Sequence, residues 1–258
     1  MSKYIYKYFR FDENLKRSLC NSYVWFSKPE VFNDPFEFEI QGPGNLRKNE
    51  VVEYFHLLID VLGVRIDEIL QGDTDAFFFA YEQDPEKFLD LFLEPFRTKL
   101  NSWGLSCFSG TFDNILMWSH YAAKHTGLVI KFDREKLDSS LKKSSDFSLM
   151  NSVNYQVDFP LINISKEREK TVSSIREIVF TKAIDWEYED EIRIWSNKTG
   201  EHKFSKDSVA EVILGANFPE PSKAKLSSIL EKHYPNNKII LSQMVLSKRM
   251  FTLEKKPI

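Results

Sequence analysis

Short segments rich in β-branched and aromatic residues recur along the chain and predict strands, because such side chains favour extended structure. The expected strands are residues 4–9, 23–27, 104–109, 127–133, 152–157, 188–195 and 210–216, followed by one or two more near the end. Other segments place apolar residues at helical spacing and predict helices. The expected helices are residues 13–20, 112–125, 165–180 and 221–233.

Residues 49–101 differ from the rest because helical periodicity replaces the strand pattern there. The segments VVEYFHLLIDVL (51–62) and EKFLDLFLEPFRTKL (86–100) each carry an apolar face. Pro95 should kink or break the second of these helices. We therefore expect one α+β domain over residues 1–258, with a twisted mixed or antiparallel sheet and a helical insertion at about 49–101.

The composition mainly excludes certain partners and kinds of site. The net charge of −3 provides no overall positive field, so nucleic acid is not indicated as a partner. No run of 18 apolar residues is present and the first residues lack an apolar signal-peptide core, which predicts a cytoplasmic protein without a membrane partner. Cys20 and Cys107 are too few for a disulfide framework or a cysteine zinc site, and we expect buried thiols.

The segment FNDPFEFEI (32–40) combines four apolar side chains with three acids. Its proline restricts the backbone, and its Asn and Asp can hydrogen-bond the nearby chain, so a rigid turn is expected. We expect Phe32 and Phe36 to be buried in the core. Carboxylates beside buried aromatic rings are costly unless paired or solvated, so Asp34 or Glu37 should face a site.

The segment MWSHYAAKHTG (117–127) holds two histidines, His120 and His125, five residues apart. Histidine pairs that bind a metal from one helix are usually three or four residues apart, so no metal is expected. Either His120 or Tyr121 lines a pocket, or His120 is a hydrogen-bonded core residue.

The segment DWEYEDEIRIW (185–195) predicts a charged strand face. Alternation along a strand would place Glu187, Glu189, Glu191 and Arg193 on the same side. One interpretation is a solvated face. The other is a row of carboxylates directed into a cleft, with Arg193 holding one of them in a bidentate pair.

Five segments of the chain together resemble a widespread bacterial family that is known mainly as a domain of unknown function. They are the opening YKYF, WFSKPEVFNDPFE (25–37), residues 105–133, DWEYEDEIRIW (185–195) and EVILGAN (211–217). This resemblance runs in order from residue 4 to about residue 217, and it implies a family without a biochemical activity.

The layout is also similar, more loosely, to the ADP-ribosyltransferase superfamily. Those domains have a split β-sheet, a basic or His position on the first strand, a Ser or Tyr on the second, and a Glu, often in an E-x-E pair, on a later strand. The resemblance places Lys7, Ser27 and the Glu189-Asp190-Glu191 segment at these positions. Lys7 stands where the superfamily has Arg or His, and the helical segment is an addition.

This second resemblance implies an enzyme that cleaves NAD or transfers its ADP-ribose, with NAD as substrate, no metal, and a bacterial stress or phage-defence role. Glu191 would be the first choice of catalytic carboxylate, Glu189 the second, and Ser27 would contact a ribose. The expected substrate-binding residues are Tyr6, Lys7, Tyr8, Trp25, Asp34, His120, Tyr121 and Arg193. The sequence does not identify a macromolecular acceptor.

Two alternatives stay open. One is a metal-dependent hydrolase or nuclease that uses His120, His125, Asp34 and Glu37. The other is a non-catalytic module that binds a nucleotide or another molecule.

Overall fold

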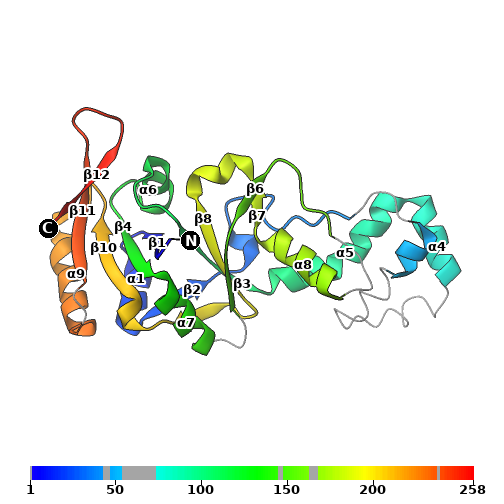
Figure 1. Cartoon of the computed structure of the whole chain (residues 1–258), viewed down its shortest axis with the longest axis horizontal. Coiled ribbons are helices and arrows are strands. Elements are labelled where there is room, and N and C mark those ends of the chain that lie inside the picture. The colour runs from blue at the N-terminus through cyan, green and yellow to red at the C-terminus, as the bar shows by residue number, and fades with distance from the viewer. Residues whose placement is uncertain (1, 43–46, 54–73, 145–147, 163–167, 237–238) are drawn as a thin grey trace. The chain divides into compact units, whose positions relative to one another are not determined.

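The computed structural model describes residues 2–42, 47–53, 74–144, 148–162, 168–236 and 239–258. The chain divides into two compact units. The first comprises residues 1–27, 104–153 and 185–258, and the second comprises residues 28–103 and 154–184. Figure 1 labels most of the helices and strands of both units.

In the described part of the chain, the first unit is built on an eight-stranded sheet with the order β12-β11-β10-β4-β1-β3-β8-β5 (Figure 1). Its strands are β1 (Tyr4–Phe9), β3 (Gly104–Ser109), β4 (Leu128–Asp133), β5 (Ser148–Ser152), β8 (Glu191–Ser196), β10 (Val209–Leu214), β11 (Ile240–Leu246) and β12 (Leu253–Pro257). Neighbouring strands are antiparallel except β10 and β11, which are parallel. The sheet is mixed, which confirms the expected α+β class.

Helices and a small sheet cover the two faces of this large sheet. They are α1 (Glu13–Asn21), α6 (Ile115–Tyr121), α7 (Arg134–Ser144), α9 (Glu220–His233) and the antiparallel pair β2 (Tyr23–Phe26) with β9 (Gly200–Lys203). One face packs against α1, α7, α9 and β2 in a large apolar cluster, and α1 lies beside α9 (Figure 1). The other face packs against α6, where Trp118 joins Tyr6 and Val129. Short 3₁₀ turns, η2 (Ile184–Glu189) and η3 (Lys206–Ser208), precede β8 and β10.

The start of α1 follows from local sequence. The Asp12 carboxylate accepts a hydrogen bond of 3.0 Å from the Leu15 N–H, which satisfies one of the free donors at a helix N-terminus. Leu15 and Leu19 then lie one turn apart and are both buried. The aspartate and the apolar spacing in the sequence are therefore sufficient to predict this helix.

The second unit contains η1 (Pro29–Val31), α4 (Thr74–Gln83), α5 (Pro85–Asn101), α8 (Arg168–Val179) and the parallel pair β6 (Asn154–Gln156) with β7 (Thr181–Ala183). Helices within residues 49–101 are thus present where expected, and α5 continues through Pro95 without a break. Of the helix expected at 51–62, residues 54–62 lie outside the described residues. Among the described residues, no helix is long and apolar enough to cross a membrane.

Two predicted elements are wrong in extent. The helix expected at 112–125 covers only Ile115–Tyr121, because residues 123–125 have positive φ angles of 49°, 55° and 67°. The strand expected at 188–195 begins only at Glu191, because η2 precedes it and Asp190 has a φ of 43°. Left-handed residues interrupt both helices and strands, and no apolar pattern signals them.

The FNDPFEFEI segment forms the expected turn, but the expected core residue is wrong. The Asp34 carboxylate accepts a hydrogen bond of 2.9 Å from the Phe36 N–H, which closes an Asx turn. Phe36 is 58% exposed and Phe32 is only partly buried, whereas Phe38 is 7% exposed and Ile40 is fully buried. The turn directs the Phe36 ring outward, and the positive φ of 60° at Phe38 returns the chain to the core.

We predict opposite outcomes for two neighbouring phenylalanines. Phe38→Ala should lower the free energy of unfolding by about 3–5 kcal/mol, because it leaves a cavity. Phe36→Ala should lower it by about 1 kcal/mol or less, because the ring is mostly in water. Denaturant unfolding of both variants provides the measurement. Equal losses would contradict the burial described for this segment.

Candidate functional site

The large sheet divides between β1 and β3. β1 pairs with β4 along all six residues, but it pairs with β3 only through Tyr6 and Ser109. The Lys7 ammonium donates a hydrogen bond of 2.7 Å to the Cys107 carbonyl on β3. A side chain thus satisfies a carbonyl that a fully paired strand would have bonded with its backbone N–H. We call this divergence of β1 from β3 the fork.

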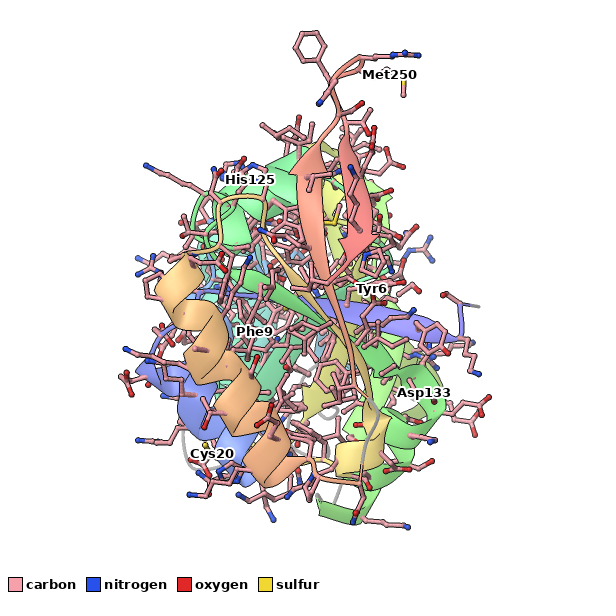
Figure 2. All side chains as sticks on the ribbon, turned by 90° about the vertical axis from the view of Figure 1, so that its left-hand side faces the viewer. Tyr6, Phe9, Cys20, His125, Asp133 and Met250 are labelled. Carbon is pink, nitrogen blue, oxygen red and sulfur yellow. The ribbon has the colours of Figure 1, made fainter. Side chains whose placement is uncertain are left out.

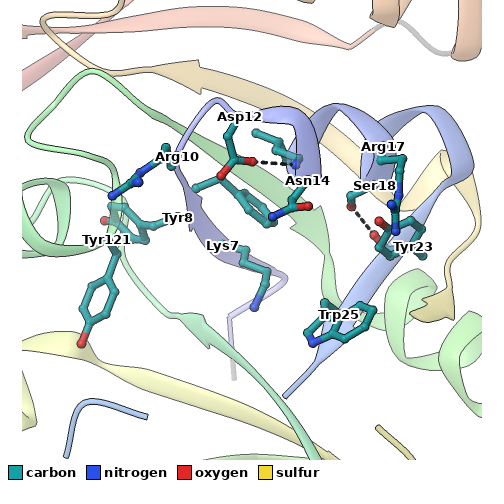
Figure 3. Close-up of a pocket in the computed structure, with 12 residues that line it drawn as sticks. Lys7, Tyr8, Arg10, Asp12, Asn14, Arg17, Ser18, Tyr23, Trp25 and Tyr121 are labelled. Carbon is teal, nitrogen blue, oxygen red and sulfur yellow. Dashed lines mark hydrogen bonds between the residues drawn. The ribbon is translucent and has the colours of Figure 1, made fainter. Parts of the chain in front are cut away.

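A pocket of about 450 Å³ lies beside the fork, within the first unit. Its lining comes from β1, α1, β2 and α6, and comprises Lys7, Tyr8, Phe9, Arg10, Asp12, Asn14, Leu15, Arg17, Ser18, Tyr23, Trp25 and Tyr121. Figure 3 shows Lys7 between Tyr121 on one side and Trp25 on the other. The Trp25 side chain is 53% exposed, so a flat aromatic surface is accessible at the pocket.

The pocket wall is cationic. It carries Lys7, Arg10 and Arg17 against one carboxylate, that of Asp12, which is already bonded to the first turn of α1. Burial lowers the pKa of Lys7, and the Glu191 carboxylate opposes that shift. Among the described residues, Arg10 forms no ion pair. Arg17 pairs with Glu201 at 3.5 Å, so the positive charge open to an anion in the pocket comes mainly from Arg10 and Lys7.

Aromatic rings hold Lys7 in place as well. Its ammonium lies 4.7 Å from the centre of the Phe108 ring and 5.9 Å from that of Phe9. The negative faces of such rings attract a cation. Lys7 is therefore a fixed part of the wall, and not a freely moving surface chain.

Tyr121 links the pocket to a buried carboxylate. Its hydroxyl donates a hydrogen bond of 2.5 Å to Glu189 Oε1. Glu189 ends η2 and is almost completely buried. The Tyr121 ring therefore lies between the pocket and the Glu189 carboxylate.

The backbone around Glu189 is held by the loop after β3. The Ser109 hydroxyl donates to the Glu189 carbonyl at 2.7 Å, and the Gly110 N–H donates to the Asp190 carbonyl at 2.7 Å. A Cβ at Gly110 would lie 2.1 Å from the Asp190 carboxylate, so a larger residue there would displace the Asp190 side chain. The Asn114 amide also donates to the Tyr188 carbonyl. These contacts determine where the Glu189 side chain lies.

Glu191 and Arg193 form the bidentate pair considered from the sequence, but they form it inside the protein. Arg193 Nε lies 2.9 Å from Glu191 Oε1, and its Nη2 lies 3.2 Å from Oε2. Both side chains are buried, and Glu187 and Glu189 precede the strand in η2, so a solvated strand face is wrong and so is a row of these carboxylates along one strand face. Burial raises the pKa of the neighbouring Cys107 thiol, and the Glu191 carboxylate adds to this. The charge of Glu191 is thus balanced within the sheet.

Four of the candidate site residues line the pocket: Lys7, Tyr8, Trp25 and Tyr121. Tyr6 is not part of this lining; its ring packs beside α6, where it contacts the Phe112 ring at 5.2 Å. Ser27 follows β2 and is not part of the lining; its backbone pairs with that of Leu105 on β3.

Two further candidates also lie apart from the pocket lining. Asp34 belongs to the Asx turn of the second unit and does not line this pocket. His120 is exposed and lies near the rings of Tyr121 and Tyr188.

His125 stabilises the turn after α6. Its ring is stacked with that of Trp118, and its Nε2 lies 3.2 Å from the Ser119 hydroxyl oxygen. Its Nδ1 is buried without a hydrogen-bond partner in the described structure. The described residues contain no group of three or more His, Cys, Asp or Glu suited to a metal ion.

Sequence reasoning missed Arg10, Asn14, Arg17 and Tyr23 as pocket residues. A signal was present on α1, because Asn14, Arg17 and Ser18 are three and four residues apart and share a helix face. The sequence could not show that this face lies beside β2, since the contact joins separate elements.

The fold and the pocket define an α+β protein with a cationic, aromatic pocket beside a forked sheet. Residues 117–194 match a family described as "Protein of unknown function (DUF2971)", and this segment includes Tyr121, Glu189, Glu191 and Arg193. The match covers less than a third of the chain. It agrees with the resemblance to a domain of unknown function that the sequence showed. No curated protein and no solved structure matches the chain, so no comparison supports the likeness to ADP-ribosyltransferases.

We predict that Arg193→Met will lower the free energy of unfolding by about 3–5 kcal/mol, because it leaves the Glu191 carboxylate buried without its main cation. The double variant Glu191→Leu/Arg193→Met should lose less, since neither charge is then buried alone. Denaturant unfolding of the two variants decides the point. A double variant at least as unstable as Arg193→Met would show that the charge pair is not what Arg193 provides.

We also predict acid sensitivity from His125. Burial lowers its pKa, so the unfolded chain takes up a proton first as the pH falls through about 6.5, and stability decreases below that pH. Burial has the same effect on His202. His125→Asn should reduce the loss of stability between neutral and mildly acidic pH, because Asn tolerates a positive φ and does not titrate. An unchanged pH dependence in thermal melts would count against this role.

Proposed function

We propose that the chain binds NAD in the pocket beside the fork and cleaves its nicotinamide–ribose bond, releasing ADP-ribose or transferring it to an acceptor. The observation that carries the proposal is the arrangement of Lys7, Trp25 and Tyr121 around one pocket, with Tyr121 bonded to the buried Glu189. These residues come from three separate elements and a 3₁₀ turn. An enzyme that breaks one bond must bring residues from separate elements together around that bond.

The charge and shape of the pocket suit a dinucleotide. NAD carries a diphosphate, and Arg10, Arg17 and Lys7 supply positive charge along the wall. NAD also carries two planar rings, which can stack on Trp25 or Tyr121. The volume of about 450 Å³ falls within the usual range of small-molecule sites.

Glu189 is the carboxylate that we assign to the reaction; because it lies behind Tyr121 and does not line the pocket, the Tyr121 ring would have to turn aside for the carboxylate to reach the ribose. When the bond breaks, nicotinamide departs with the bonding electron pair, and positive charge develops on the ribose. A fixed carboxylate close to the ribose stabilises that charge. Glu189 is preferred to Glu191 because Glu189 is held by a residue of the pocket wall, whereas Glu191 is held by Arg193. This reverses the order suggested by the sequence.

Lys7 would have a binding role here. Its ammonium is held beside the fork by the Cys107 carbonyl, and it can hydrogen-bond a ribose or phosphate oxygen without moving far. Trp25 and Tyr121 on either side of it would then position the nucleotide rings (Figure 3). Water or a nucleophile of the acceptor would attack the ribose carbon from the open side.

We predict that Glu189→Gln will lower NAD cleavage by roughly 10²–10³-fold with little loss of stability, the scale for losing one transition-state electrostatic partner. Glu187→Gln is the matched control, because Glu187 lies two residues earlier on the same turn but is exposed. Release of nicotinamide and transfer of labelled ADP-ribose to protein, DNA or RNA are the measurements.

Three results would decide between the proposals. Cleavage lost in Glu189→Gln and kept in Glu187→Gln would support this assignment. Equal activity in the two variants would remove Glu189 from the reaction. NAD binding that depends on Trp25, with no turnover in the unaltered protein, would indicate the non-catalytic module instead.

A further inference from the structure

The hairpin formed by β11 and β12 ends in an exposed apolar tip. Strand pairing extends to Leu246 and Leu253, and residues 247–252 form the connection. Within it, the Phe251 side chain is 104% exposed and that of Met250 is 66% exposed, while Leu246 at the base is 68% exposed. Figure 2 shows Met250 at this tip, beyond the ends of the two strands. Exposed apolar clusters of this kind mark interaction surfaces.

The tip is preorganised. The Ser247 N–H donates to the Thr252 carbonyl at 3.0 Å, and the Thr252 N–H donates to the Met250 carbonyl at 2.8 Å. The connection is therefore closed by its own backbone hydrogen bonds. A partner that binds Phe251 would not have to order the loop first, which lowers the cost of binding.

The same tip is positively charged. Lys248 and Arg249 are exposed, and neither forms an ion pair with the described residues. No acidic residue occurs between Leu246 and Leu253. Residues 246–251 thus present two exposed cations and three exposed apolar side chains, those of Leu246, Met250 and Phe251.

We propose that the tip of this hairpin docks on an anionic lipid surface, with Phe251 and Met250 entering the boundary of the acyl chains and Lys248 and Arg249 contacting headgroup phosphates. This pairing of apolar insertion with adjacent cations is the chemistry of peripheral membrane binding. It is independent of the function proposed for the pocket. It departs from the sequence expectation of no membrane partner, which concerned a spanning segment.

Lipid fits the tip better than two other occupants. Nucleic acid binding draws most of its affinity from several phosphate contacts, and the tip offers two cations in a chain of net charge −3. A second copy of the chain would bring the same cations together, and like charges repel.

The test is flotation of the full-length chain with vesicles of phosphatidylcholine containing about one third phosphatidylserine, compared with pure phosphatidylcholine. We expect binding only to the anionic vesicles. Met250→Ser/Phe251→Ser and, separately, Lys248→Glu/Arg249→Glu should each lower the bound fraction at least roughly tenfold. Circular dichroism should be unchanged, because these side chains make no core contacts.

Matched controls separate the tip from the rest of the surface. Val157→Ser changes another exposed apolar residue, and Lys232→Glu changes another exposed cation, and both variants should bind as before. No binding to anionic vesicles, or binding unaffected by both tip variants, would overturn the proposal. Tip-dependent binding of duplex DNA or tip-dependent self-association, without vesicle binding, would overturn it in favour of those partners.

Discussion

The hydrogen bond from the Lys7 ammonium to the Cys107 carbonyl is the interaction on which the site depends. It satisfies a partly buried backbone acceptor at the point where β1 and β3 separate. Without such a donor, closing the two strands into a regular ladder would be the cheaper way to satisfy that carbonyl. A regular ladder would leave less space between them. A side chain that lines the pocket, and not a backbone N–H of β1, therefore satisfies this carbonyl of β3.

Two buried carboxylates, those of Glu189 and Glu191, lie near the pocket, and each is held by a partner side chain. Glu191 is paired with Arg193 inside β8, and Glu189 is bonded to Tyr121 of α6. Buried charges are tolerated only when partners and geometry are in place. These contacts join the loop after β3, the turn before β8 and the end of α6. The tertiary structure thus holds the pocket wall by polar bonds as well as by apolar packing.

Much of the fold was predictable because its signals are local. The aromatic pattern of residues 4–9 predicts β1, and Asp12 with the spacing of Leu15 and Leu19 predicts α1. The candidate site was predictable in part, since Lys7, Tyr8, Trp25 and Tyr121 do line one pocket. Their aromatic and cationic chemistry indicated a ligand even before their positions were known.

The remaining features depend on contacts between distant segments. A left-handed residue at Asp190 separates Glu189 from the strand that carries Glu191, so the two carboxylates have different partners. The turn at Asp34 exposes Phe36, although the apolar pattern favoured its burial. The sequence by itself determined which segments become strands and helices and which side chains can bind an anion or a ring. Only the tertiary structure decided which of those side chains meet, because strand pairing and backbone reversals fix the direction of each side chain.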